Sequence, residues 1–297
     1  MKREKRIFAL GFFDGVHLGH QALLSRCVEL AGELEAEPSA ITFDRHPQAL
    51  FREDVPALIN TTEDRQRLLK SFGMETVRVY PVVREVMSMP WQEFVTELIA
   101  LGAVGFVCGN DFRFGAGGQG NAENLLAFCR RQNIPCIIVP EQTAQGIRIS
   151  STHIRTLLEN GEMDAAMAFL GHPHMFTGTV VPGRHLGRTI GVPTANLRLP
   201  PDVLVPKFGV YACLAVVDGK KYPAVTNIGT RPTVGGHHVT VEPWILDFSG
   251  NLYDRELTLQ FYQFLRPEKK FDSLEELKQE ISKNAAQTRA IFAETDY

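Results

Sequence analysis

The sequence predicts an α/β protein: a doubly wound parallel sheet in the first half, then a smaller antiparallel barrel that ends in a helix. Three observations carry this prediction. Between residues 6 and 139, short apolar runs alternate with amphipathic segments, as in parallel strands joined by helices. After about residue 173 the runs become β-rich and are separated by turn signals such as Asp218-Gly219. Ser273, with Glu276 three residues later, has the pattern of a helix capping box.

The elements of the first half follow in order. Strands are expected at residues 6–13, 40–43, 76–80, 105–108 and 136–139. Helices are expected at residues 20–35, 62–72, 91–101 and 123–132, followed by two short helices at 152–159 and 162–170. Such a sheet binds ligands beyond the carboxyl ends of its strands.

Residues 171–174 (GHPH) break the pattern and read as a linker, which gives predicted domains of residues 1–172 and 173–297. In the second domain, strands are expected at residues 176–181, 210–217, 221–226, 239–248 and 256–264. The terminal helix is expected to run from Ser273 to about residue 293. Neither an internal repeat nor a low-complexity segment is found in the sequence.

Composition narrows the class of protein. A chain of 297 residues with 44% hydrophobic and 22% charged residues fits one large or two medium globular domains. A net charge of −3 argues against broad nucleic-acid binding. An odd number of cysteines without CxxC spacing predicts reduced, buried thiols rather than disulfides or a zinc site. These are Cys27, Cys108, Cys129, Cys136 and Cys213.

The first residues include four basic side chains, but the apolar run after them ends at Asp14, which is too short for a signal peptide. No apolar stretch approaches the roughly 20 residues that span a bilayer. We therefore expect a cytoplasmic protein with no membrane or nucleic-acid partner, and the sequence leaves its oligomeric state open.

The run GFFDGVHLGH at residues 11–20 directly follows the first predicted strand. Its glycines let the backbone approach phosphates closely, and the helix that follows presents the positive end of its dipole. His17 and His20 can donate hydrogen bonds to phosphate oxygens. We therefore predict a nucleotide site, against the alternative that both histidines only cap a helix. Its predicted residues are Gly11, Phe12, Asp14, His17 and His20.

Three further segments carry polar groups near strand ends. The segment ISSTHIR at residues 149–155 places hydroxyls at a helix N-terminus with an arginine one turn later, and Arg148 precedes it. The segments TFDRHP at 42–47 and GNDFRFG at 109–115 each follow a predicted strand. The first segment predicts a second anion site, or else only a helix cap, and the aromatic side chains could pack on a planar ligand or simply in the core. The predicted anion contacts are Arg148, Ser151, Thr152 and Arg155.

A second phosphate-type constellation lies in the predicted barrel, in the run GTVVPGRHLGRTIGVPTANL at residues 178–197. Repeated glycines, including Gly183 and Gly191, allow the backbone to fold around phosphates, and Arg188 adds positive charge. Thr194 and Asn196 are oxygen donors on one side of an extended chain, which suits Mg²⁺. The alternative is a plain barrel loop.

Glu242 stands on an otherwise apolar predicted strand. A carboxylate there can act as the general base for a primary hydroxyl. The alternative is an ordinary solvated position on a strand.

Together these segments resemble the prokaryotic bifunctional riboflavin kinase/FAD synthetase (FMN adenylyltransferase) family. The HxGH pattern is common to nucleotidyltransferases, whereas GNDFRFG and ISSTHIR narrow the resemblance to the branch that makes FAD. In the second half, the PTAN sequence at 193–196, NIGTRPT at 227–233, Glu242, Arg266 and Phe271 match the kinase, and the resemblance covers residues 7–292. It implies an N-terminal nucleotidyltransferase domain and a C-terminal β-barrel riboflavin kinase domain.

The resemblance implies two consecutive reactions. In the barrel, MgATP phosphorylates the terminal ribityl hydroxyl of riboflavin, with Glu242 as base and Thr194 and Asn196 holding Mg²⁺ and phosphate. The loop from Gly183 to Gly191, with Arg188, closes over the nucleotide. In the first domain, FMN attacks the α-phosphorus of a second ATP, giving FAD and pyrophosphate. There the flavin contacts are His46, Asn110, Asp111 and Phe112.

Three positions depart from the family pattern. Arg45 stands where proline is usual, Pro243-Trp244 replaces Val-His after the glutamate, and Asn284 replaces a commonly acidic residue. Because proline lacks a ladder donor, the strand around Pro243 is expected at a sheet edge or at a bulge. The change lies beside the predicted base and bears on the efficiency of the kinase.

Three alternatives remain open from the sequence. The first is an FAD synthetase with a weak or inactive kinase domain. The second is a non-catalytic flavin-binding regulatory protein, which would be free to lose the phosphate groups that both sites retain. The third is an adenylyltransferase for another phosphorylated alcohol, in which the barrel would have no evident purpose.

Overall fold

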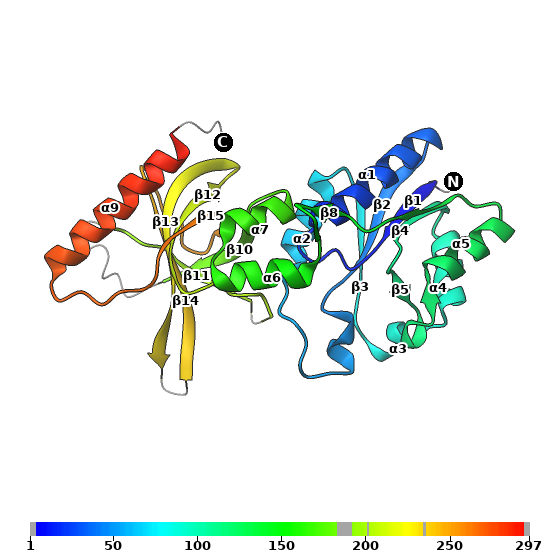
Figure 1. Ribbon diagram of the computed structural model, residues 1–297, viewed down its shortest axis with the longest axis horizontal. Coiled ribbons are helices and arrows are strands. Elements are labelled where there is room, and N and C mark those ends of the chain that lie inside the picture. Colours follow the sequence, from blue (N-terminus) through cyan, green and yellow to red (C-terminus); the bar gives the residue numbers. More distant parts are fainter. Residues whose placement is uncertain (1–3, 183–191, 201, 234–235, 294–297) are drawn as a thin grey trace. The chain divides into compact units, whose positions relative to one another are not determined.

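A computed structural model describes residues 4–182, 192–200, 202–233 and 236–293 (Figure 1). The chain divides into two compact units, Met1–Ser151 and Thr152–Tyr297. Helices α6 (Ser151–Asn160) and α7 (Met163–Leu170) therefore group with the second unit, where α7 packs on strands β10 and β15. The predicted boundary after residue 172 assigns both helices to the first domain, and that boundary stays a prediction.

The first unit is built on a five-stranded parallel sheet in the order β3-β2-β1-β4-β7, which confirms the doubly wound prediction. Its strands are β1 (Arg6–Leu10), β2 (Glu37–Phe43), β3 (Thr76–Tyr80), β4 (Ala103–Gly109) and β7 (Cys136–Val139). The helices are α1 (Leu18–Glu33), α2 (Thr62–Ser71), α3 (Arg84–Met87), α4 (Trp91–Ala100) and α5 (Ala122–Arg131).

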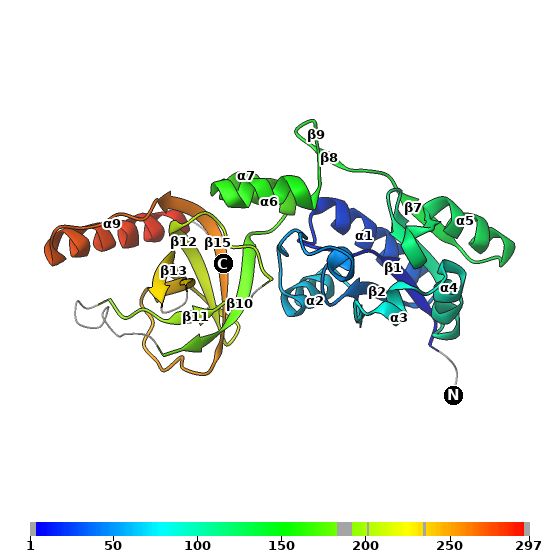
Figure 2. The same cartoon turned by 90° about the horizontal axis from the view of Figure 1, so that it is seen from below.

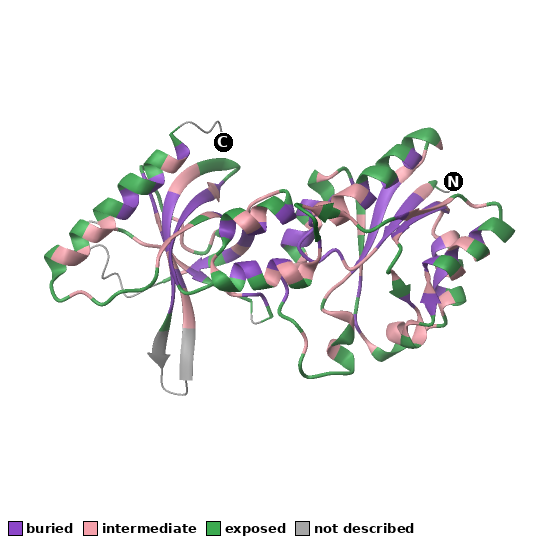
Figure 3. Cartoon of the chain, viewed as in Figure 1, coloured by how far each residue is buried: buried purple, intermediate pink, exposed green. Residues whose placement is uncertain are grey.

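Helices cover both faces of this sheet. Successive side chains of β1 point to opposite faces, so they pack against different helices. Phe8 and Leu10 pack with residues of α4 and α5 in one apolar cluster. Ile7 lies on the other face, near Leu30 of α1. Because both faces are covered, the central strands β1, β2 and β4 are mostly buried, as Figure 3 shows.

The order of the strands fixes where a ligand can bind. The chain proceeds from β1 to β2 and β3 on one side of β1, and then crosses to β4 on the other side. The order of the strands therefore runs in opposite directions on the two sides of β1. A crevice forms at such a switch point beyond the carboxyl ends of the strands. The GFFDGVHLGH run follows β1 and the GNDFRFG segment follows β4, so both predicted segments meet at this crevice.

Two small antiparallel ladders add to the first unit. Strands β5 (Arg113–Phe114) and β6 (Gly120–Asn121) pair after β4. Strands β8 (Thr143–Ala144) and β9 (Ile147–Arg148) form a hairpin after β7, which stands away from the sheet in Figure 2. Neither ladder was predicted, because strands of two residues carry no periodicity.

The second unit contains the predicted barrel, closed in the order β10-β11-β14-β13-β12-β15. Its strands are β10 (His174–Val181), β11 (Asn196–Arg198), β12 (Gly209–Val217), β13 (Lys220–Thr233), β14 (Gly236–Ile245) and β15 (Glu256–Arg266). Tyr211 and Phe176 each pack against Phe261 in the interior, with ring centroids 5.4 and 5.2 Å apart. Helix α9 (Leu274–Phe292) packs on β12 and β13.

Pro243 corrects one expectation. The strand β14 lies within the closed barrel, and its register with β13 runs through Pro243 without a bulge. The carbonyl of Pro243 accepts a hydrogen bond from the backbone N–H of Ala195, at 2.9 Å. In an antiparallel strand the N and C=O of one residue point to the same side, so the missing N–H faces Ala195 and costs the β13–β14 ladder nothing.

Several local signals are confirmed. Ser273 caps α9 by accepting from the N–H of Glu276, although the Glu276 carboxylate accepts from the N–H of Asp272 instead of from Ser273. Asp218 and Gly219 both have positive φ (50° and 79°), as the tight turn between β12 and β13 requires. The cysteines are free thiols, and Cys136 alone of the five is only half-buried. No helix within the described ranges is long and apolar enough to cross a membrane.

Candidate active sites

A cavity of about 340 Å³ occupies the crevice of the first unit. Residues from the ends of β1 and β4 line it, together with the segment that leads into α6. Of the predicted nucleotide residues, the structure brings together Gly11, Phe12, His17, His20, Arg148 and Ser151, and of the predicted flavin residues Asn110, Asp111 and Phe112. Thr152 and Arg155 continue α6 in the second unit and stay predictions.

His17 and His20 stack face to face, with ring centroids 3.6 Å apart. Nδ1 of His17 accepts a hydrogen bond from the backbone N–H of His20 at 3.2 Å, so His17 caps α1 as the structural alternative requires. An imidazole that accepts at Nδ1 carries its proton at Nε2, which leaves a donor on a ring that lines the cavity. The cap and the phosphate contact are therefore compatible roles.

Burial keeps the His20 ring neutral. Burial lowers the pKa of His20 well below its ordinary value of 6.5, and the charges of His17 and Arg65 lower it further. Two stacked imidazoles would repel each other if both were protonated. The pair therefore offers N–H dipoles rather than two fixed positive charges.

Asp14 holds the turn instead of lining the cavity. Its carboxylate is 2% exposed and accepts from the backbone N–H of Ile59 at 2.9 Å. Its carbonyl accepts from the hydroxyl of Ser151, and the hydroxyl of Thr42 donates to the carbonyl of Phe12. These bonds tie the turn after β1 to β2 and to the start of α6.

Arg65 was not predicted, yet it is fully buried under this turn. Its guanidinium lies over the Phe12 ring, 4.5 Å from the centroid, and Nη2 donates to the Phe43 carbonyl. Burial lowers the pKa of Arg65, whereas the Asp14 carboxylate raises it. Nε and Nη1 have no hydrogen-bond partner. In sequence Arg65 is an ordinary charged position of an amphipathic helix, so no local signal distinguishes it.

Arg148 and Asp111 were predicted for different ligands but pair with each other. Arg148 Nη2 lies 3.0 Å from the carboxylate of Asp111 and 2.8 Å from that of Glu141. His46 lines no described cavity; it caps a short 3₁₀ turn, and its ring meets Phe12 edge-on with centroids 5.4 Å apart. Its predicted flavin contact stays a prediction.

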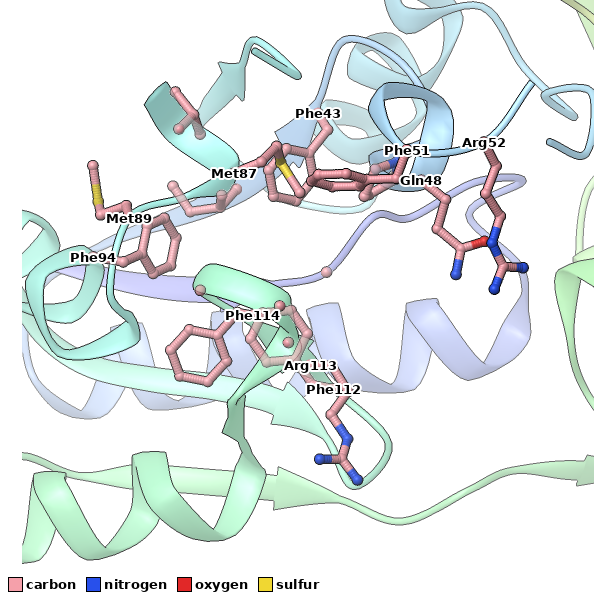
Figure 4. Close-up of a pocket in the computed structure, with 17 residues that line it drawn as sticks. Phe43, Gln48, Phe51, Arg52, Met87, Met89, Phe94, Phe112, Arg113 and Phe114 are labelled. Atoms are coloured by element: carbon pink, nitrogen blue, oxygen red, sulfur yellow. The ribbon is translucent and has the colours of Figure 1, made fainter. Parts of the chain in front are cut away.

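A second, larger cavity of about 620 Å³ adjoins the first and is mostly apolar (Figure 4). Phe112 and Phe114 stack in it, with centroids 5.1 Å apart. The side chains labelled in Figure 4 line this cavity and come from strands, helices and the segments between them: Phe43, Gln48, Phe51, Arg52, Met87, Met89, Phe94, Phe112, Arg113 and Phe114. Its size and apolar walls suit a planar aromatic ligand.

The two cavities share a wall. Their common residues are Gly11, Phe43, Pro47, Phe112 and Arg113. A ligand bound in the apolar cavity would therefore present its polar end to the cavity of the two histidines.

The barrel contains a third cavity, of about 300 Å³, which Glu242 and Trp244 line from one face of β14. Across the sheet, Asn227 of β13 pairs with Glu242. On the other side Leu197 pairs with Val241, and continuing that antiparallel register by one residue sets Asn196 opposite Glu242. Side chains directly opposite each other share a face of the sheet, so the predicted base and one predicted metal ligand lie together.

A fourth cavity, of about 460 Å³, lies on the other face of β14, with Pro243 and Ile245 in its wall. Thr194 lines both barrel cavities. Phe248 and Tyr253 give the fourth cavity aromatic walls. The predicted phosphate-loop residues Gly183, Arg188 and Gly191 lie outside the described residues.

Asn284 is 2% exposed and lines the third cavity from α9. Its side-chain oxygen accepts from Nε of Arg266 at 3.0 Å, and Glu280 pairs with the same nitrogen at 3.3 Å. Burial lowers the pKa of Arg266, and the nearby Glu280 and Glu268 carboxylates raise it. Asn284 therefore accepts a hydrogen bond from Arg266, as an acidic side chain at this position also would.

The described residues form no cluster of three or more His, Cys, Asp or Glu that could hold a metal ion. A Mg²⁺ site does not need one, because Mg²⁺ takes few protein oxygens and completes its shell with water and substrate phosphates. Thr194 and Asn196, the predicted ligands, each carry a side-chain oxygen, and such hard ligands fit Mg²⁺.

Comparison with known proteins agrees with this geometry. The FAD synthetase family model matches residues 1–153, and the riboflavin kinase family model matches residues 170–292. A bifunctional riboflavin kinase/FMN adenylyltransferase of Listeria monocytogenes is 36% identical over 98% of this chain and 94% of its own. The chain belongs to the bifunctional riboflavin kinase/FMN adenylyltransferase family.

Other relatives cover the same length. The Escherichia coli K12 member of the family is 35% identical over 99% of this chain and 95% of its own. A crystal structure described as a macrolide-efflux protein from Streptococcus pneumoniae superposes with a TM-score of 0.86 at 30% identity, covering 97% of this chain and 95% of that one. The shared fold thus extends over both units.

Proposed function

We propose that the two halves of this chain catalyse consecutive steps from riboflavin to FAD. The chain makes FAD in two ATP-dependent reactions: the barrel phosphorylates riboflavin, and the first unit adenylylates FMN. The observation that carries the residue assignments is the shared wall of the two cavities in the first unit. It joins an apolar chamber for a flavin ring to a polar chamber for a triphosphate.

In the barrel, Glu242 takes the proton from the terminal ribityl hydroxyl, whose oxygen attacks the γ-phosphorus of ATP while ADP leaves. The third cavity, which contains Glu242, holds riboflavin between Trp244 and Phe271. The fourth cavity holds the nucleotide, with Phe248 and Tyr253 beside its base.

Thr194 belongs to both barrel cavities, so its hydroxyl lies where the two substrates meet. With Asn196 it would hold Mg²⁺, which supplies charge neutralisation for the transferred phosphoryl group when bound. The glycine-rich loop with Gly183, Arg188 and Gly191 would cover the phosphates.

In the first unit, a phosphate oxygen of FMN attacks the α-phosphorus of ATP, and pyrophosphate leaves. His17 and His20 donate to triphosphate oxygens, assisted by the backbone after Gly11 and by Ser151. Thr152 and Arg155 follow Ser151 in the chain and stay predicted anion contacts. The apolar cavity with Phe112 binds the flavin ring, and Asn110 and Asp111 lie at its polar end.

The second candidate function is an FAD synthetase with a weak kinase. The observation behind it is Trp244, a bulky ring beside Glu242 in a cavity of only about 300 Å³. Supplying FMN separates the two, because only the weak-kinase enzyme would need FMN to form FAD.

The test uses the whole enzyme with MgATP and either riboflavin or FMN, with products resolved by chromatography. Replacing His17 and His20 together with Ala should abolish FAD formation from FMN and leave FMN formation from riboflavin intact. Glu242→Gln should abolish the kinase step and leave FAD formation from FMN intact. Equal loss of both products in either variant would contradict the division of labour.

A further inference from the structure

We propose that Arg113 is the side chain that binds the 5′-phosphate of FMN and so selects FMN over flavins without a phosphate. The inference rests on the proposed adenylyltransferase function and adds a residue that the site assignments above do not use. Its basis is the position of Arg113 at the wall shared by the flavin and triphosphate cavities.

The reaction requires a cation at this wall. FMN carries a dianionic phosphate, and it must approach the α-phosphorus of a second anion, ATP. One P–O bond forms from the FMN phosphate to the α-phosphorus, and the bond from that phosphorus to its bridging oxygen breaks as pyrophosphate leaves with the electron pair. Without a cation between them the two anions repel each other strongly at such close range.

Arg113 is the one charged residue among the five that line both cavities. The other four are glycine, proline and two phenylalanines. A phosphate at this junction can therefore pair only with Arg113 among the side chains of the shared wall. Guanidinium groups match phosphate geometry with two parallel hydrogen bonds.

The other arginines in or beneath the walls of these two cavities are already engaged or line only one cavity. Arg148 pairs with Asp111 and Glu141, and Arg65 is fully buried over the Phe12 ring. Arg52 lines only the flavin cavity. Within the described part of the chain, Arg113 has neither an ion pair nor a side-chain hydrogen bond. Its charge is thus available to a ligand.

The backbone holds Arg113 in place. It lies on β5 and pairs with Asn121 of β6, between two phenylalanines that stack on each other. In Figure 4 its guanidinium extends away from the rings of Phe112 and Phe114. Neighbouring residues of a strand point to opposite faces, so the aromatic pair can hold the flavin ring while Arg113 reaches the phosphate.

The test measures FAD formation from FMN by the whole enzyme bearing Arg113→Gln. We expect KM for FMN to rise by about tenfold or more, with KM for ATP nearly unchanged. Lumiflavin, which has the ring system but neither ribityl chain nor phosphate, should inhibit competitively with the same inhibition constant as in the wild type. Arg113→Lys should recover part of the affinity for FMN.

Two controls belong to the same experiment. Arg131→Gln changes another exposed arginine, in the last turn of α5, and should match the wild type. Riboflavin phosphorylation by each variant reports whether the barrel is intact.

An unchanged KM for FMN in Arg113→Gln would overturn the inference. So would an equal weakening of FMN and lumiflavin, since that would indicate lost packing in place of a lost phosphate contact. If Arg113→Gln does not fold, the same two constants, KM for FMN and the inhibition constant of lumiflavin, are measured for Arg113→Lys and decide the question. A wild-type enzyme that forms no FAD from FMN would instead overturn the proposed function.

Discussion

His174 makes the stability of the barrel depend on pH in a way that can be calculated. It lies in β10, is 2% exposed, and neither ring nitrogen has a hydrogen-bond partner. Burial lowers its pKa from 6.5 to about 3, with a smaller effect from the nearby His172. The unfolded chain therefore binds a proton at His174 well above the pH at which the folded barrel does.

The sign and size of the effect follow from proton linkage. Because the folded-state pKa is depressed, the contribution of His174 to stability is fully present above pH 6.5 and is lost as the pH falls toward 3. Between pH 7 and pH 5 the loss is about 2 kcal/mol from this one residue. His174→Phe should remove that loss, and at pH 7 it should stabilise the barrel by about 1–3 kcal/mol, because an unsatisfied polar ring is replaced by an apolar one.

The assay is urea unfolding at pH 7, 6 and 5, followed by tryptophan fluorescence. The chain has two tryptophans, Trp91 in the first unit and Trp244 in the barrel, so a Trp91→Phe background reports on the barrel alone. His172→Gln is the matched control, because His172 is only half-buried, and its smaller effect acts on a His174 pKa near 3, so the slope between pH 7 and pH 5 should stay close to the wild-type slope. Parallel pH slopes for His174→Phe and its parent would refute the reasoning.

Three further predictions concern single side chains, each checked by urea unfolding. Pro243→Val restores an N–H that faces Ala195, so it should stabilise the barrel by about 1 kcal/mol; a destabilised variant would mean that the strand depends on the proline. Asn284→Leu leaves Nε of Arg266 without this acceptor and should cost about 1–3 kcal/mol, whereas Asn284→Asp should be tolerated; equal losses would argue against the hydrogen bond. Arg65→Met removes the cation beside the buried Asp14 carboxylate and the hydrogen bond to the Phe43 carbonyl, so it should destabilise the first unit by about 3–5 kcal/mol; an unchanged unfolding midpoint would mean that the pair contributes nothing to stability.

Much of the fold could be predicted because its signals are local. The alternation of apolar runs and amphipathic helices predicted the parallel sheet, and Ser273 and Asp218-Gly219 gave a helix start and a turn that the structure confirms. The strand β11 was not predicted, because three residues after a proline carry no alternation. The sheet edge or bulge expected at Pro243 was wrong, because which side of a strand lacks its donor depends on the pairing partner.

The candidate site was also predictable only in part. Motifs placed His17, His20 and Phe112 at strand ends, and the sheet order then brought them to one crevice. The larger, apolar cavity draws its other walls from segments distant in the chain, such as α3 with Met87 and the turn that ends at Phe51.

By itself the sequence determined the fold class, the family resemblance and the two phosphate-type segments, because each depends on residues close together along the chain. Only the tertiary structure decided that Asn196 faces Glu242, that Arg65 is buried and that Arg113 lies between two cavities. Register, burial and cavity walls arise from contacts between segments far apart in the chain, and no local pattern encodes which partner each segment meets.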